Sequence, residues 1–117
     1  MRWTNWRKIA DKDCWYADSL DWDGPACYEL GLRGPRGGRH RTVYVGETLN
    51  ERRRILTYAK TGSHLSELVI ESLNDGWHLY YHAILCQTKE SAILLQNRLL
   101  FKYFYEWNKQ LNSWIPL

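Results

Sequence analysis

The residues that most directly suggest a chemistry are arginines in the middle of the chain. Between positions 33 and 60 eight basic residues oppose two acidic ones, Glu47 and Glu51, so this stretch carries +6 and, with a total of +3, the remainder carries about −3. Arginine predominates, and its planar guanidinium forms paired hydrogen bonds to phosphate oxygens. The pattern favours a surface for a phosphate backbone over an ordinary solvated loop. The basic residues are Arg33, Arg36, Arg39, Arg41, Arg52, Arg53, Arg54 and Lys60.

A second chemically informative residue is an amide near the C-terminus. In a predicted helix over residues 89–107, apolar side chains recur at three-to-four spacing, among them Ala92, Leu99 and Tyr103, and Gln96 falls inside this stripe. A buried amide without partners costs about 1 to 3 kcal/mol, so Gln96 needs hydrogen bonds. It is either a structural residue or part of a site, and the periodicity alone favours the structural role.

Histidine and cysteine do not supply a metal-binding motif. The four histidines lack finger-like spacing, and ordinary hydrogen bonding is the expected role for most of them. His64, near the predicted start of a helix, is a candidate phosphate contact. Cys14, Cys27 and Cys86 are odd in number and widely separated, which predicts reduced core thiols rather than a disulfide framework.

Three segments have the pattern of strands. Residues 26–30 and 42–45 are short apolar runs on either side of a glycine-rich basic stretch, residues 33–41, which predicts a hairpin with a long basic tip. Residues 77–86 alternate aromatic and polar side chains and predict a third strand. The sequence therefore predicts a small three-stranded antiparallel sheet.

Three helices are predicted to flank this sheet. The first spans about residues 48–60 and opens with a capping box formed by Thr48 and Glu51. The second spans about residues 63–74, and the third is the helix of residues 89–107. Strands and helices in this order indicate an α/β protein of the α+β type.

Composition places these elements in one domain. The chain has 117 residues, enough for one compact core over residues 1–117. Residues 1–24 are rich in tryptophan and aspartate and are expected to form an acidic cap over the sheet. No apolar run is long enough to span a bilayer, so we expect a cytoplasmic protein without a membrane partner.

A known family places several of these residues in one pattern. Tyr28 lies on the first predicted strand, the second contains Tyr44-Val45-Gly46, and Arg54 and Tyr58 follow four residues apart on one helix face. This succession resembles the GIY-YIG endonuclease superfamily over roughly residues 26–108. Only the tyrosine of the family's first motif is retained, whereas the second motif matches well.

The resemblance implies catalytic roles for the same side chains. Tyr28 or Tyr44 would accept a proton from the attacking water, Arg54 would contact the scissile phosphate, and Tyr58 would donate a hydrogen bond to a phosphate oxygen. A phenol with a pKa near 10 is mostly protonated at neutral pH, so the site is expected to lower that pKa.

The family's metal position is the main departure. Members bind Mg²⁺ or Mn²⁺ through a glutamate on the last helix, and here Gln96 stands in its place. A neutral amide is a poor ligand for a hard cation. Either the amide was introduced to trap a substrate complex, which we favour, or it marks a natural DNA binder that no longer cuts. Glu47 is expected to form an ion pair, with metal ligation as the alternative.

The resemblance thus predicts a metal-dependent DNA endonuclease that hydrolyses phosphodiester bonds, in a form impaired by Gln96. A non-cleaving DNA-binding module that retains the nuclease fold is the first alternative, and a protein-interaction domain with a tryptophan-rich surface is the second. The oligomeric state stays open. The expected DNA contacts are Arg33, Arg36, Arg39, Arg41, Arg52, Arg53, Lys60 and His64.

Overall fold

The structure of the protein, a computed structural model, describes residues 2–15, 23–59 and 65–108. Two of the predicted DNA contacts, Lys60 and His64, lie outside these residues. Within the described part of the chain, no helix is long and apolar enough to cross a membrane.

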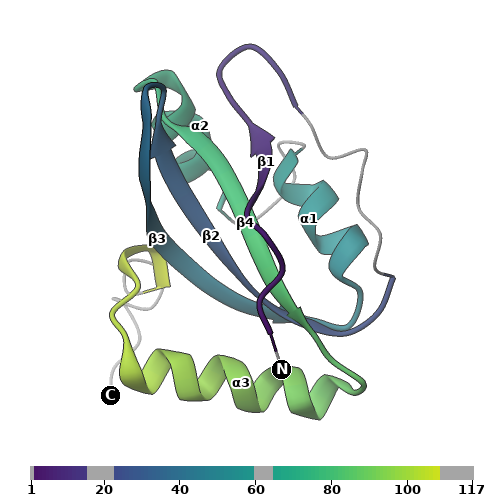
Figure 1. The fold of residues 1–117 in the computed structure, drawn as a ribbon. Coiled ribbons are helices and arrows are strands. Elements are labelled where there is room, and N and C mark those ends of the chain that lie inside the picture. The colour runs from purple at the N-terminus through teal and green to yellow at the C-terminus, as the bar shows by residue number, and fades with distance from the viewer. Residues whose placement is uncertain (1, 16–22, 60–64, 109–117) are drawn as a thin grey trace.

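The fold is built on one antiparallel sheet with the strand order β1-β4-β2-β3 (Figure 1). Its strands are β1 (Arg7–Ala10), β2 (Ala26–Gly34), β3 (Gly37–Thr48) and β4 (His78–Leu85). Strand β2 lies in the middle, paired with β3 on one side and β4 on the other. The predicted antiparallel sheet flanked by helices is therefore confirmed, with four strands instead of three.

The additional strand comes from the N-terminal segment. Residues Arg7–Ala10 pair with β4, with Arg7 opposite Tyr81, and form one edge of the sheet. Ile9 and Ala10 are fully buried. This part of the expected acidic cap is thus a piece of the sheet, because its few apolar side chains complete the core at that edge.

The hairpin of β2 and β3 is longer and tighter than predicted. Gly34 pairs with Gly37, so the connection is the two residues Pro35 and Arg36, and most of the predicted basic tip of residues 33–41 is strand. Gly37 has a φ of 88°, a conformation that glycine adopts without strain. The arginines of this stretch therefore lie on paired strands or in the short turn, and β4 pairs with β2 as far as Arg33.

Three helices accompany the sheet: α1 (Glu51–Ala59), α2 (Ser66–Asn74) and α3 (Lys89–Lys102). Helix α1 is capped by Asn50, whose Oδ1 accepts a hydrogen bond of 2.9 Å from the Arg53 amide. The predicted cap Thr48 instead ends β3. Helix α3 ends at Lys102, five residues before the predicted end at Trp107, which is buried separately in the core.

The two faces of the sheet are covered by different helices (Figure 1). On the α1/α2 face, β2 and β4 residues pack with Ile55 of α1 and with Val69 and Leu73 of α2. On the α3 face, Cys27 and Val45 pack with Leu95 and Leu99. The period-two alternation of the strands separates these two cores.

Candidate functional site

Three tyrosines from three different elements meet on the α1/α2 face. The hydroxyls of Tyr28 on β2 and Tyr58 on α1 are 2.7 Å apart and share a hydrogen bond. The ring of Tyr44 on β3 lies 6.2 Å from that of Tyr28, measured between centroids. Tyr28 is 2%, Tyr58 1% and Tyr44 9% exposed, so the phenols form a buried polar cluster. Burial of hydroxyls is tolerated here because they bond to one another.

A glycine makes room for this cluster. Gly46 pairs with Tyr28 across the two strands, and a Cβ at position 46 would lie 2.5 Å from the Tyr28 hydroxyl. Carbon and oxygen do not approach so closely without a bond, so a larger residue would displace the phenol. The glycine that follows Tyr44 and Val45 is therefore required by the position of the Tyr28 ring.

Arg54 supplies the positive charge beside the phenols. Its charge lowers the pKa of all three tyrosines. Burial acts in the opposite direction and is the larger effect, so the pKa of Tyr28 lies well above its ordinary value and the pKa values of Tyr44 and Tyr58 are raised as well. Burial thus outweighs the charge of Arg54, and the expected lowering of a phenol pKa by the site stays a prediction.

Tyr44 differs from the other two phenols in its hydrogen bonds. For Tyr44 the bonds to Tyr58 and Tyr28 lower the pKa, as does Arg54, and only burial and the charge of Glu47 raise it. For Tyr28 the bond to Tyr58 raises the pKa. Of the three, Tyr44 has the surroundings that best support a phenolate.

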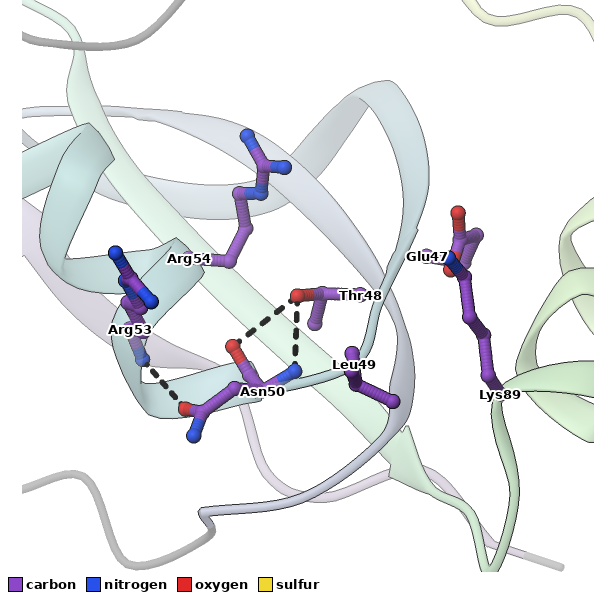
Figure 2. Close-up of a pocket in the computed structure, with 7 residues that line it drawn as sticks. All are labelled: Glu47, Thr48, Leu49, Asn50, Arg53, Arg54 and Lys89. Carbon is purple, nitrogen blue, oxygen red and sulfur yellow. Dashed lines mark hydrogen bonds between the residues drawn. The ribbon is translucent and has the colours of Figure 1, made fainter.

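Arg54 also lines a pocket of about 460 Å³ at the end of β3 and the start of α1 (Figure 2). Figure 2 shows Arg53 and Arg54 on one side of this pocket and Glu47 and Lys89 on the other. Three of these four side chains are cationic, which suits an anionic ligand such as a phosphate. The lining residues are Glu47, Thr48, Leu49, Asn50, Arg53, Arg54 and Lys89.

Glu47 is held in this pocket without a hydrogen-bond donor. Its Oε2 atom is buried and no described residue donates to it. The ion pair expected for Glu47 is absent from the described residues, although Lys89 lines the same pocket. A buried carboxylate oxygen without a partner is unusual in a folded protein.

Gln96 lies on α3, the helix whose first residue, Lys89, lines the pocket. This helix packs through Leu95 and Leu99 on the face of the sheet opposite to the phenols, and Gln96 is half-buried. It is absent from the residues that line the pocket. Among the described residues, no three histidine, cysteine or acidic side chains are close enough to form a metal site of their own.

Four exposed arginines among the predicted DNA contacts form two groups. Arg52 and Arg53 are exposed on α1 beside the pocket, and Arg36 and Arg39 are exposed at the far end of the hairpin. Two others have local partners. Arg41 forms an ion pair with Glu106, and the guanidinium of Arg33 lies 6.0 Å from the centre of the Tyr80 ring.

One residue that sequence reasoning missed holds the edge strand in place. Asn108 accepts a 2.9 Å hydrogen bond from the Val45 amide and donates one of 2.9 Å to the Val45 carbonyl. It thereby completes the backbone bonds of β3 directly beside Tyr44. No local pattern marks Asn108, because its partner is 63 positions away in the chain.

Comparison with known proteins places this arrangement in a family. Residues 21–115 match GIY-YIG domain-containing proteins. A comparison with curated proteins gives no match. Among solved structures, that of a bacteriophage T4 EndoII mutant is similar, with a TM-score of 0.66 and 16% sequence identity over 90% of this chain and 89% of that one. The predicted nuclease-like fold is thus confirmed, and the chain belongs to the GIY-YIG domain family.

Proposed function

We propose that this protein is a divalent-metal-dependent endonuclease that hydrolyses phosphodiester bonds in DNA. The observation that carries the proposal is the hydrogen-bonded pair of buried phenols, Tyr28 and Tyr58, beside an arginine that also lines a cationic pocket. Phenols without such a setting are common in protein cores. An arginine shared between a phenol cluster and a pocket brings a potential base and a phosphate-binding group together.

In this proposal the pocket binds the scissile phosphate. Arg53 and Arg54 lie on one wall and offer forked N–H donors to its non-bridging oxygens. As negative charge grows on those oxygens during attack by water, Arg54 stabilises it. Arg54 therefore contacts the reacting group and is the first candidate for a catalytic residue.

Tyr44 is the proposed general base. It must lose its proton before it can accept one from water, and Arg54 and the bonds to Tyr28 and Tyr58 all favour its ionised form. Tyr58 is 1% exposed and shares hydrogen bonds with Tyr28 and Tyr44, and the bond to Tyr44 raises its pKa, so its proposed role changes from a phosphate contact to a donor to the Tyr44 hydroxyl. Tyr28 completes this chain of phenols.

A divalent cation bound at the scissile phosphate would stabilise the departing sugar oxygen, which is the chemistry that Mg²⁺ or Mn²⁺ supplies in such sites. The chain offers it the carboxylate of Glu47, whose buried Oε2 has no donor among the described residues. Gln96 offers only a neutral amide, a weaker ligand for these hard cations. We therefore expect slow cleavage by the chain as it stands.

Restoring a carboxylate at position 96 tests the function. In nicking assays on supercoiled plasmid with Mg²⁺ or Mn²⁺, Gln96→Glu is expected to raise the cleavage rate about tenfold or more. In that background Arg54→Ala should lower the rate by about 10²- to 10³-fold, the effect of removing one donor to a transition-state oxyanion. Arg98→Ala, which removes an exposed arginine from α3, is the control for loss of a positive charge and should change the rate little.

A second candidate function, a DNA-binding module without cleavage, is favoured by one observation, the amide at position 96. It predicts that the Gln96→Glu protein binds DNA with a strong salt dependence and yet leaves the plasmid intact with either cation. That outcome would replace the endonuclease proposal. Cleavage that persists in the Arg54→Ala variant would instead show that the chemistry lies elsewhere.

A further inference from the structure

The pocket at the end of β3 carries more positive charge than an intact phosphodiester needs. Its lining includes three cations, Arg53, Arg54 and Lys89. Glu47 is the one acid among the described lining residues, so three positive charges less one negative leave a formal +2. A phosphodiester carries one negative charge, whereas a terminal phosphate carries about −1.5 to −2 at neutral pH. We infer that this pocket binds the terminal phosphate of a cut DNA strand, and that Lys89 gives it this preference.

This inference rests on the proposed function for the source of the terminal phosphate. Hydrolysis joins the oxygen of water to phosphorus and breaks the bond from phosphorus to one sugar oxygen. One proton of that water ends on the departing sugar oxygen, and the other is released to solvent when the new phosphate ionises, with a pKa of about 6. The group in the pocket is therefore more negative after the reaction than before it, and it matches the charge of the pocket better as product.

Two helices begin at this pocket and place cations near their starts. Helix α1 begins at Glu51, with Arg53 and Arg54 as its third and fourth residues, and α3 begins at Lys89. The first turn is the positive end of the helix dipole, where anionic side chains are stabilising and cationic ones are not. A bound anion reverses this effect, because it interacts favourably with the helix starts as well as with the side chains. The positions of these cations thus favour a strongly anionic ligand.

Lys89 adds a donor from a different direction. Figure 2 shows it on the side of the pocket opposite Arg53 and Arg54. Its side chain is exposed, and none of the ion pairs within the described part of the chain involves it. Each guanidinium can bind two phosphate oxygens with its fork, and the ammonium donates from a single point. A diester has two non-bridging oxygens and a terminal phosphate has three, so Lys89 has an oxygen to bind only in the second case.

Glu47 limits how tightly such an end is held. It lies on the same side of the pocket as Lys89 in Figure 2, and its buried Oε2 receives no hydrogen bond from the described residues. In the absence of a cation this carboxylate repels a phosphate, and it repels a dianion more than a monoanion. Removing its charge should therefore strengthen the binding of a phosphorylated end.

Equilibrium binding in EDTA tests the site without relying on cleavage. The probes are one short labelled duplex with a 5′-phosphate, the same duplex with a 3′-phosphate, and the same duplex with hydroxyls at both ends. The wild type is expected to bind at least one phosphorylated form about tenfold more tightly than the hydroxyl form, the effect of one added hydrogen bond between charged groups. The preference should fall at about pH 5, where the terminal phosphate carries a single charge.

Three variants separate the pocket from general electrostatic attraction. Lys89→Met should abolish the preference for the phosphorylated end and change the affinity for the hydroxyl duplex much less, whereas Lys89→Arg should retain the preference. Glu47→Gln should increase it. Lys102→Met, which removes an exposed lysine from the other end of α3, is the matched control and should leave the preference unchanged.

Equal affinity of the wild type for the phosphorylated and hydroxyl duplexes would overturn the inference, as would a preference that persists in full in Lys89→Met. The plasmid assay separates these failures from that of the proposed function. If Gln96→Glu cleaves while the wild type shows no preference, the endonuclease proposal stands and the terminal-phosphate site is wrong. If the preference depends on Lys89 and no variant cleaves, the site stands and the endonuclease proposal is wrong.

Discussion

Two carboxylates of the sheet, Glu29 on β2 and Glu47 on β3, differ in their hydrogen bonds. On the α3 face, Glu29 accepts hydrogen bonds at both oxygens, from His82 at 2.6 Å and from the Tyr105 hydroxyl. The His82 ring is stacked between Trp3 and Trp6 at 4.1 and 3.7 Å. Glu47 lies on β3 opposite Cys27 and keeps a buried oxygen without a donor among the described residues.

We interpret this difference as that between a structural polar network and a group that can still bind a ligand. A carboxylate whose oxygens are both bonded fixes its neighbours and has no capacity left for a ligand. Glu29 therefore organises the α3 face, where Trp3 and Trp6 pack against histidine rings instead of presenting both faces to unpaired bases. The Glu47 carboxylate still has an oxygen that can bind a ligand. We therefore expect the reaction to take place at the pocket that Glu47 lines together with Arg53, Arg54 and Lys89.

The largest expected effect comes from two glycines, one beside the phenol cluster and one beside the tryptophan and histidine rings of the α3 face. A Cβ at Gly46 would lie 2.5 Å from the Tyr28 hydroxyl, and one at Gly31 would lie 2.8 Å from the Trp6 ring. Gly46→Ala should lower DNA cleavage in the Gln96→Glu background by about 100-fold or more, because a misplacement of about 1 Å in a site has that effect. Gly31→Ala should lower the free energy of unfolding by about 1 to 3 kcal/mol through overpacking.

As a control, DNA cleavage and the free energy of unfolding are both measured for both variants. Plasmid nicking per folded molecule should be unchanged in Gly31→Ala, with the folded fraction taken from urea unfolding. If Gly31→Ala lost cleavage as strongly as Gly46→Ala, the α3 face would not be purely structural. If Gly46→Ala cleaved normally, the phenol cluster would have no role in the reaction.

The grouping of Tyr28, Tyr44, Tyr58 and Arg54 could be predicted because local rules determine it. Strand alternation fixes the face of each tyrosine, and the four-residue spacing on α1 brings Arg54 and Tyr58 to one side. The family pattern then sets the register between these elements. Their catalytic roles are still predictions.

Other features depend on contacts between distant parts of the chain and have no local pattern. Strand β1 is only four residues long, Arg7–Ala10, and pairs with β4 some 70 positions later, so neither period nor length reveals it. The two hydrogen bonds between the Asn108 side chain and the Val45 backbone also join residues that are far apart in sequence. The pocket beside Glu47 depends equally on where the start of α3, with Lys89, comes to lie.

Buried phenols on both faces predict a second, smaller effect at alkaline pH. Burial raises the pKa of Tyr58 on the α1/α2 face and of Tyr105 on the α3 face. An unfolded phenol ionises near pH 10, so above that pH unfolding releases protons and the free energy of unfolding falls. The stability contributed by each buried phenol is fully present below about pH 10 and is lost at about 1.4 kcal/mol per pH unit above it.

Tyr58→Phe and Tyr105→Phe should each flatten this dependence by a similar amount, because both phenols are almost fully buried. Urea unfolding at several pH values between 8 and about 11 measures the slope. The two variants should differ in plasmid nicking, which only Tyr58→Phe is expected to lower. An unchanged slope in Tyr58→Phe would mean that this hydroxyl already ionises in the folded protein.

The smallest expected effect is on the salt dependence of DNA binding, and it should differ between two arginines of the same hairpin. Arg36 is exposed in the two-residue turn, whereas Arg41 is paired with Glu106. Each phosphate contact releases counterions and contributes about 0.9 to the slope of log affinity against log salt. Arg36→Ala should therefore reduce that slope by about one and Arg41→Ala by less, since Glu106 already compensates the Arg41 charge. Fluorescence anisotropy of labelled duplex across a KCl series measures both slopes. Equal slopes for Arg36→Ala and wild type would show that the hairpin turn is not part of the DNA interface.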